Sequence, residues 1–138
     1  MRVLVTGGAG YLGNHLSRLL IERGHKARSF DRSCSGDGPI ADLEKAGCEI
    51  VKGDIRKLAD FPQLMDGVEG VIHIAGLAND PSCDLDPLMA LDVNLEATKT
   101  LAQRAMHAGV RRFVFASSCS VYGKGMFEML DEHSPTNP

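Results

Sequence analysis

The chain has 138 residues, of which 43% are hydrophobic and 24% charged, a composition ordinary for one globular domain with its own core. Its net charge of −3 and its scattered lysines and arginines exclude the basic surface that nucleic-acid binding requires. No apolar run reaches the ~18 residues of a membrane span, and a strand pattern begins at once without a signal peptide, so we expect a cytoplasmic protein that contacts no membrane.

The first strand pattern breaks into a glycine cluster, Thr-Gly-Gly-Ala-Gly-Tyr-Leu-Gly, at residues 6–13. We expect each glycine to have a separate role. Gly8 lies in the tight turn that leaves the strand, Gly10 lets a phosphate approach the backbone, and Gly13 lets the next helix pack closely on the strand. A helix that begins near Tyr11 would direct unpaired N–H groups and its positive dipole end at that phosphate. The cluster therefore predicts a cradle for a pyrophosphate.

A glycine-rich turn between any strand and helix is the alternative interpretation of this cluster. The context favours dinucleotide binding, because a strand precedes the cluster, a helix follows it, and Asp31 ends the next strand 18 residues after Gly13. That spacing is close to the roughly 20 residues at which a carboxylate meets the ribose hydroxyls of a dinucleotide.

Strand and helix patterns alternate along the rest of the chain. In chain order we expect a strand at 3–6, a helix from 11 to 23, a strand at 26–31, a loop at 32–39, a short helix at 41–46, a strand at 49–52, a helix at 57–66, a strand at 70–75, a loop at 76–86, a long helix at 87–108 and a strand at 112–116. The expected apolar faces are Leu12, Leu16, Leu19 and Leu20 on the first helix, Leu58, Phe61, Leu64 and Met65 on the helix at 57–66, and Leu88, Leu91, Leu95, Leu101, Ala102 and Ala105 on the long helix. From residue 117 onward the chain is rich in turn residues.

This alternation predicts an α/β fold built from βαβ units. Right-handed crossovers then give a Rossmann-type doubly wound parallel sheet of about five strands, with helices on both faces. In such a fold the ligand lies over the carboxyl ends of the strands.

The four cysteines, Cys34, Cys48, Cys83 and Cys119, are widely spaced and match no zinc-binding pattern. We expect reduced thiols and no metal site. We assign no chemistry to Cys119, although it lies within a motif described below.

Six motifs follow one another along the chain: the glycine cluster at 6–13, Phe30-Asp31-Arg32, Gly53-Asp54-Ile55-Arg56, Val71-Ile72-His73-Ile74-Ala75-Gly76, Asp92-Val93-Asn94-Leu95 and Ser117-Ser118-Cys119-Ser120-Val121-Tyr122-Gly123. Together they make the chain resemble the extended short-chain dehydrogenases/reductases of the NAD-dependent epimerase/dehydratase family, over essentially all 138 residues. In the family's register the glycines that match are Gly7, Gly10 and Gly13. The resemblance implies NAD as cofactor, held by Gly7, Gly10, Tyr11, Leu12, Gly13, Asp31, Arg32, Asp54, Ile55, Ile74, Ala75, Gly76, Ala78, Asn94 and Ala116.

Two acidic residues would define the adenosine end of the cofactor. Asp31 can accept hydrogen bonds from the ribose hydroxyls, and its charge would repel a 2′-phosphate, which favours NAD over NADP. Arg32 leaves NADP open, because a guanidinium can pair with a phosphate, and a plain loop carboxylate is the alternative for Asp31. Asp54 and Ile55 resemble the family's adenine-binding pair, whereas a turn and helix cap is the alternative at Asp54, and both can hold together.

Three further polar residues have implied or alternative roles. The resemblance makes Ser118 the catalytic serine that hydrogen-bonds the reacting hydroxyl or carbonyl, whereas the alternative is a serine that satisfies loop backbone groups. It makes Asn94 an orienting residue beneath the active site, with ordinary core hydrogen bonding as the alternative. His73 is flanked by isoleucines in a buried strand, so we expect a hydrogen-bonded core histidine rather than an acid or base. Tyr122 does not match the family's catalytic tyrosine.

The family's catalytic base is a Tyr-x-x-x-Lys pair on a later helix, which would follow Ser118 by a couple of dozen residues. Neither tyrosine of this chain forms that pair, because His15 follows Tyr11 at the fourth position and Met126 follows Tyr122. We therefore interpret residues 1–138 as an incomplete NAD-binding Rossmann domain, without that helix and without the substrate-binding C-terminal part. The fifth strand would then be an exposed edge, which predicts a homo-oligomer or completion by the missing region.

The resulting hypothesis is the NAD-binding part of a sugar-nucleotide epimerase or dehydratase. The intact enzyme would transfer a hydride transiently from a hydroxyl of its small-molecule substrate, a nucleotide sugar, to bound NAD. Two alternatives remain: a catalytically silent dinucleotide-binding module, and an NADP-linked reductase of the same superfamily that acts on a non-sugar carbonyl. For the chain as it stands we predict NAD binding without turnover.

Overall fold

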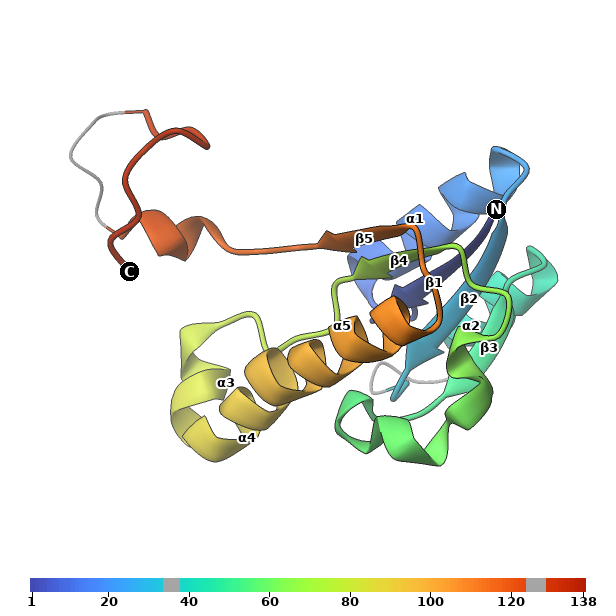
Figure 1. Cartoon of the computed structure of the whole chain (residues 1–138), viewed down its shortest axis with the longest axis horizontal. Helices are drawn as coiled ribbons and strands as arrows, with labels where there is room; N and C mark the ends of the chain where they lie inside the picture. The colour runs from blue at the N-terminus through green and yellow to red at the C-terminus, as the bar shows by residue number, and fades with distance from the viewer. Residues whose placement is uncertain (34–37, 124–128) are drawn as a thin grey trace.

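A parallel sheet runs through the centre of the computed structural model, which describes residues 1–33, 38–123 and 129–138 (Figure 1). In the described residues it has five strands: β1 (Arg2–Thr6), β2 (Lys26–Asp31), β3 (Glu49–Lys52), β4 (Gly70–His73) and β5 (Arg112–Phe115). The predicted α/β class and parallel sheet are confirmed. The strands begin or end within two residues of the expected positions, while part of the expected loop at 32–39, Cys34 included, lies outside the described residues.

The strand order is β3-β2-β1-β4-β5, so the chain moves outward on one side of β1 and then returns to its other side. Thr6 at the end of β1 is in register with Phe30 of β2 and with His73 of β4. β1 continues into a helix on one face of the sheet, whereas the chain after β4 leads to a helix on the other face. This is the switch point at which doubly wound sheets bind their ligands.

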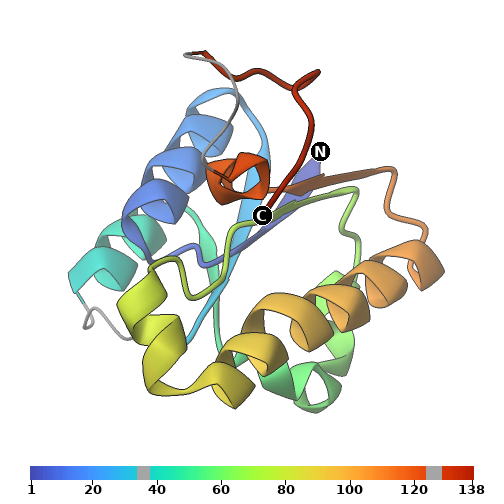
Figure 2. The ribbon, with the colours of Figure 1, turned by 90° about the vertical axis from the view of Figure 1, so that its left-hand side faces the viewer.

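Helices cover both faces of the sheet, as predicted (Figure 2). α1 (Tyr11–Glu22) and α2 (Gly38–Lys45) lie on one face, around a small apolar cluster that includes Ala27 and Leu43. α5 (Ala97–His107) and the segment between β3 and β4 cover the other face, where the larger core lies. Leu4 and Leu101 are fully buried there.

The expected helix at 57–66 is wrong in type. The chain forms two short 3₁₀ helices, Ile55–Asp60 and Pro62–Met65, because Pro62 has no N–H to donate and can only begin a helix. The apolar side chains assigned to that helix still reach the core: Leu58, Leu64 and Met65 are buried.

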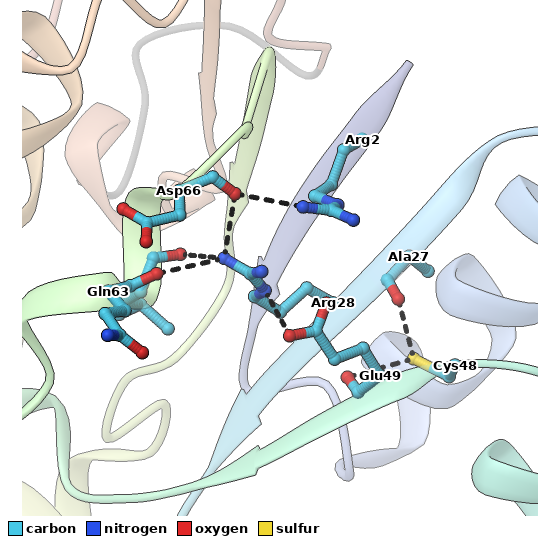
Figure 3. A network of polar contacts seen from close by, with 8 residues as sticks. Arg2, Ala27, Arg28, Cys48, Glu49, Gln63 and Asp66 are labelled. Atoms are coloured by element: carbon cyan, nitrogen blue, oxygen red, sulfur yellow. Dashed lines mark hydrogen bonds and ion pairs between the residues drawn. The ribbon is translucent and has the colours of Figure 1, made fainter.

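Three arginines hold this irregular segment through its carbonyl groups, and Arg28 makes the most contacts. Arg28 on β2 is buried, and its Nη1 donates to the carbonyl oxygens of Gln63 at 3.2 Å, Leu64 at 2.6 Å and Asp66 at 3.2 Å (Figure 3). Its Nε forms an ion pair with Glu49 Oε1 at 2.9 Å. The guanidinium therefore supplies donors that carbonyls at the end of a 3₁₀ helix lack.

Arg2 and Arg104 add contacts to the same segment. Arg2 Nη1 donates to the carbonyl of Asp66 at 3.2 Å, and Arg104 Nη2 donates to that of Phe61 at 2.7 Å (Figure 3 shows the Arg2 contact). The segment is thus held from β1, from β2 and from α5.

The expected long helix at 87–108 is interrupted. It consists of α4 (Pro87–Leu91), a π-helical turn at Asp92–Glu96, and α5, and the expected loop at 76–86 contains a further short helix, α3 (Asp80–Leu85). A π turn holds one more residue than an α turn, so the phase of the apolar pattern changes there.

The predicted apolar faces are partly wrong on α1 and on this long helix. Leu12, Leu19, Leu88, Leu91 and Leu95 are exposed, while Gly13, Ser17, Val93, Ala97, Leu101 and Ala105 are buried. Both helices meet the sheet mainly through small side chains, which let the backbones approach closely. The leucine pattern alone does not reveal that small side chains face the sheet.

β5 is an edge of the sheet, as expected, and Val114 and Phe115 on it are 56% and 51% exposed. After Ala116 the chain leaves the sheet as a tail that projects away from the helices (Figure 1). In the part of the chain that the structure describes, no helix is both long enough and apolar enough to cross a bilayer.

Candidate functional site

Two adjoining cavities, of about 260 and 810 Å³, lie at the carboxyl ends of β1 and β4. The residues that line both are Gly7, Gly10, Ile74, Ala75, Gly76 and Leu77. Because these six residues form a shared wall, we treat the two cavities as one groove across the switch point of the sheet.

Every residue that the sequence predicted for the site lines this groove. The smaller cavity contains Gly7, Gly10, Asp31, Arg32, Asp54, Ile55, Ile74, Ala75 and Gly76. The larger one adds Tyr11, Leu12, Gly13, Ala78, Asn94, Ala116 and Ser118. The structure thus brings together residues from all six motifs, while their contacts with a ligand stay predictions.

The turn out of β1 depends on three glycines. Gly7 has φ +73°, a conformation that side chains rarely adopt, and its N–H donates to the carbonyl of Phe30 at 2.8 Å. A Cβ on Gly13 would collide with the carbonyl of Gly7, so the expected close packing of α1 is observed. The turn role expected for Gly8 is confirmed, because Gly8 lies inside the turn that the Gly10 N–H closes by donating to the carbonyl of Gly7 at 3.1 Å. Gly8 also lacks a Cβ because Ser29 occupies that space.

Gly10 differs from these glycines because only one atom lies near the position of its missing side chain. Within 4 Å, a Cβ there would meet only the carbonyl oxygen of Gly7, at 3.2 Å. Gly10 is also the N-cap of α1 and provides no capping side chain, so the first N–H groups of the helix have no side-chain acceptor. An anion such as a pyrophosphate fits this end of the groove.

Asp31 joins the end of β2 to the glycine turn. Its Oδ2 accepts from the N–H of Ala9 at 3.1 Å, and its Oδ1 accepts from the N–H of Ser33 at 2.7 Å. A carboxylate has about four acceptor positions, so two hydroxyl groups of a ribose can still bind it. The role in the loop and the role in binding are compatible.

Asp54 is the N-cap of the 3₁₀ helix Ile55–Asp60, which supports the capping alternative. Its Oδ1 accepts from the N–H of Arg56 at 2.9 Å, and the Arg56 guanidinium also binds the carboxylate. Hydrogen bonds from Arg56 lower the pKa of Asp54 to about 2, with a small further effect from Arg32, whose Nη1 lies 3.8 Å from Asp54 Oδ2. The carboxylate is therefore ionised at neutral pH and can accept from an amino group.

Asn94 holds the loop after β4. Its Oδ1 accepts from the N–H of Leu77 at 2.8 Å, and its Nδ2 donates to the carbonyl of Leu77 at 3.0 Å. The side chain is exposed and projects from the π turn, so ordinary core hydrogen bonding does not describe it. Asn94 orients the wall that the two cavities share.

Ser118 lies on the opposite wall, at the start of the tail. Its Oγ accepts from the N–H of Ser120 at 3.1 Å and caps the 3₁₀ helix Cys119–Tyr122. The backbone role considered for this serine is therefore observed. Among the described residues no acceptor takes the hydroxyl proton of Ser118, so this proton can be donated to an oxygen in the groove.

Sequence reasoning missed part of the lining. Leu77, Cys83 and Phe115 line the groove without having been assigned to it. Phe115 was foreseeable as the last residue of a strand that ends at the groove, whereas Cys83 lies on α3, which had no recognisable apolar pattern. In the described ranges no cluster of His, Cys, Asp and Glu side chains could hold a metal ion, and Met126 lies outside those ranges.

Comparisons with known proteins agree on one family. The model of the NAD dependent epimerase/dehydratase family matches residues 3–138. A UDP-glucose 4-epimerase of Klebsiella pneumoniae is 37% identical over 129 residues, which are 89% of this chain and 93% of that protein. A 3-beta-hydroxysteroid dehydrogenase of Mycolicibacterium neoaurum is 37% identical over 124 residues, 87% of this chain and 32% of that protein.

A solved structure with a similar fold carries ligands. The UDP-glucose-4-epimerase of Stenotrophomonas maltophila, with bound NAD and formylated UDP-arabinopyranose, superposes with a TM-score of 0.89 at 32% identity. The match covers 99% of this chain and 43% of that one. Apart from the Klebsiella protein, the relatives named here are therefore more than twice as long as the matched region.

Proposed function

The chain belongs to the NAD-dependent epimerase/dehydratase family, whose cofactor is NAD, and from this premise we propose that the groove at the switch point holds NAD in an extended pose. The adenosine end would occupy the smaller cavity, beside Asp31, Asp54 and Ile55, and the nicotinamide end the larger one, near Ser118. The pyrophosphate would bind where the cavities meet, at Gly10.

The position of Gly10, which lines both cavities, is the observation that carries this proposal. Gly7, Gly8 and Gly13 lack side chains because other parts of the protein occupy the space, whereas Gly10 faces the groove. The uncapped start of α1 lies at the same place and provides N–H donors.

The charges in the smaller cavity fit an unphosphorylated adenosine ribose. Asp31 lies at the end of β2, where its carboxylate would repel a 2′-phosphate. Arg32 was the reason to keep NADP open, but Asp54 lies 3.8 Å from its guanidinium and partly neutralises it. Both observations disfavour the NADP-linked reductase.

Bound NAD accepts a hydride from the carbon of an alcohol, which is the chemistry that an epimerase or a dehydratase of this family requires. Ser118 would donate a hydrogen bond to the oxygen on that carbon, and Asn94 would keep the opposite wall in place. The sequence contains no Tyr-x-x-x-Lys pair to remove the alcohol proton. We therefore expect the 138-residue chain to bind NAD without turnover by itself.

A nucleotide sugar is our first candidate for the substrate of the whole enzyme, supported by the epimerase relatives and by the sugar nucleotide in the Stenotrophomonas structure. A sterol alcohol is the second candidate, because the Mycolicibacterium hydroxysteroid dehydrogenase is as similar in sequence as the epimerase of Klebsiella. Both substrates present a secondary alcohol on a ring to NAD.

Calorimetric titration with NAD tests the proposal, with Gly10→Ala as the probe. The added methyl group would meet the carbonyl oxygen of Gly7 at 3.2 Å, a tight contact, and would lie in the path of the phosphates. We therefore expect Kd to rise roughly tenfold or more, about 1.4 kcal/mol. Gly38→Ala is the matched control, because a Cβ at Gly38 meets nothing within 4 Å and the residue lies outside the groove.

Absence of NAD binding to the unmodified chain, or equal affinity of the Gly10→Ala and unmodified proteins, would contradict the proposed pose. Incubation of the chain with NAD and UDP-galactose examines the chemistry. Conversion of UDP-galactose to UDP-glucose would refute the expectation of binding without turnover.

A further inference from the structure

A chain of hydrogen bonds crosses the interior from the groove to α5 and passes through His73. The imidazole is fully buried; its Nδ1 lies 2.6 Å from Thr6 Oγ1, and its Nε2 lies 2.8 Å from Thr98 Oγ1. The rings of Phe113 and Phe115 lie beside it, with centroid distances of 6.2 and 5.5 Å. The mechanism proposed above does not use this histidine.

The direction of every hydrogen bond in this chain follows from the carbonyl group at one of its ends. The Thr98 hydroxyl donates to the carbonyl oxygen of Asn94 at 2.8 Å, and a carbonyl can only accept. Nε2 of His73 must therefore donate to Thr98, which leaves Nδ1 of the neutral ring as an acceptor. Thr6 then donates to Nδ1, while its oxygen accepts from the N–H of Ala75 at 3.4 Å.

Both ends of this chain of hydrogen bonds reach the wall that the two cavities share. At one end Thr6 binds the backbone of Ala75. At the other end Thr98 binds the backbone of Asn94, whose side chain holds Leu77 by two hydrogen bonds. Ala75 and Leu77 line both cavities, so the placement of this wall depends on one side chain beneath it.

We propose that His73 is a positioning residue for the NAD groove. As the neutral Nε2–H tautomer, it holds Ala75 through Thr6 and Asn94 through Thr98. This inference rests on the proposed function of the groove. An apolar side chain could fill the same space, but Thr6 and Thr98 would then lose a buried partner. An imidazole offers an acceptor on one side of the ring and a donor on the other, as these two hydroxyl groups require.

Two threonines of α5 provide a matched pair of variants. Thr98 and Thr100 each donate to the carbonyl four residues earlier, at 2.8 and 2.9 Å, but only Thr98 contacts His73. Thr98→Val therefore removes the link to His73, whereas Thr100→Val makes the same chemical change outside it. We expect Thr98→Val to weaken NAD binding roughly three- to tenfold, the effect of about one hydrogen bond, and Thr100→Val to leave Kd unchanged.

A control for general destabilisation is needed, because Thr98→Val also removes a buried contact. Leu101→Ala opens a cavity in the core one turn further along α5, at a fully buried side chain that lines neither cavity of the groove. If Leu101→Ala raises Kd as much as Thr98→Val does, the effect comes from loosening of the fold and the proposal is wrong.

Nuclear magnetic resonance of the protein without NAD tests the inference independently of the proposed function. We expect the ¹⁵N spectrum to show a protonated Nε2 and a bare Nδ1 at His73 at neutral pH, and the amide of Leu77 to exchange faster in Thr98→Val than in Thr100→Val. The opposite tautomer, or equal exchange of Leu77 in the two variants, would overturn the positioning role. If these results are as expected but no form of the protein binds NAD, the function assigned to the groove fails instead.

Discussion

At His73, burial determines the charge of the side chain. Loss of hydration lowers the pKa of the imidazole to about 4, from an ordinary value near 6.5. The groups around the ring in the described structure are two threonine hydroxyls and two phenyl rings, none of which stabilises a positive charge strongly. The folded protein therefore keeps this residue neutral where the unfolded chain would protonate it.

This difference predicts a dependence of stability on pH. Between pH 6.5 and 4 the unfolded chain binds a proton that the folded protein excludes, so the free energy of unfolding should fall as the pH falls, by on the order of 3 kcal/mol over that range. Asp54, whose pKa is about 2, adds a further loss only below about pH 4. Urea unfolding at several pH values measures the slope.

His73→Gln is the control for this slope, because it removes the titrating group while keeping an amide that can donate toward Thr98. The variant should be less stable at pH 7 but show a much smaller slope between pH 6.5 and 4. An equal slope in both proteins would mean that other groups cause it.

Single residues of the site were predictable where a motif names them, since each predicted position lines the groove. The second constraint on Gly8 was not predictable, because it depends on Ser29 of the neighbouring strand, which occupies the space of a side chain there. The sequence offered a loop role and a binding role as alternatives for Asp31 and Ser118, and the structure shows that each side chain holds a backbone group. The contact between Asp31 and Ala9 joins segments 22 residues apart, so its geometry depends on how these segments meet.

At the scale of elements, the segment between β3 and β4 shows what a pattern of apolar residues leaves out. Its leucines predict burial correctly, but Pro62 divides it into two 3₁₀ helices whose carbonyl groups need donors from elsewhere. Arg28, in the middle of a strand, donates to three of those carbonyls. No sequence pattern indicates this, because the partners lie more than 30 residues apart.

Arg28→Met should therefore destabilise the protein, by roughly 2–4 kcal/mol, because three carbonyl groups lose a buried donor and Glu49 loses its ion pair. Arg2→Met removes one contact to the same segment from an exposed position and should cost less than about 1 kcal/mol. Urea denaturation of both variants compares them. An equal decrease in the free energy of unfolding in both variants would show that the carbonyl contacts of Arg28 do not stabilise the segment.

At the scale of the whole molecule, the alternation of strands and helices predicts the topology because right-handed crossovers leave few arrangements of five strands. Exposure is less predictable, since it depends on which helices reach which face. β5 shows this: it has the composition of a buried strand, yet Val114 and Phe115 are more than half exposed at the sheet edge.

This edge leads us to expect that the chain associates with itself in solution. An unpaired strand with apolar side chains can pair with another copy or pack against it. Sedimentation velocity should show a coefficient that rises with concentration, and Val114→Lys should abolish the rise. Met106→Lys, at an apolar side chain that is 69% exposed on α5, should leave it unchanged; a monomer at all concentrations would contradict the expectation.

The tail has a consequence for the kinetics of ligand entry. The amide of Ala116 donates to the carbonyl of His73, and beyond it the backbone hydrogen bonds of the described tail residues stay within the tail, as between Asn137 and Val121. Residues 117–120, one wall of the larger cavity, therefore belong to a unit with few ties to the sheet. We expect substitutions that tie this wall to the sheet to change the rate at which NAD associates, which stopped-flow fluorescence measures.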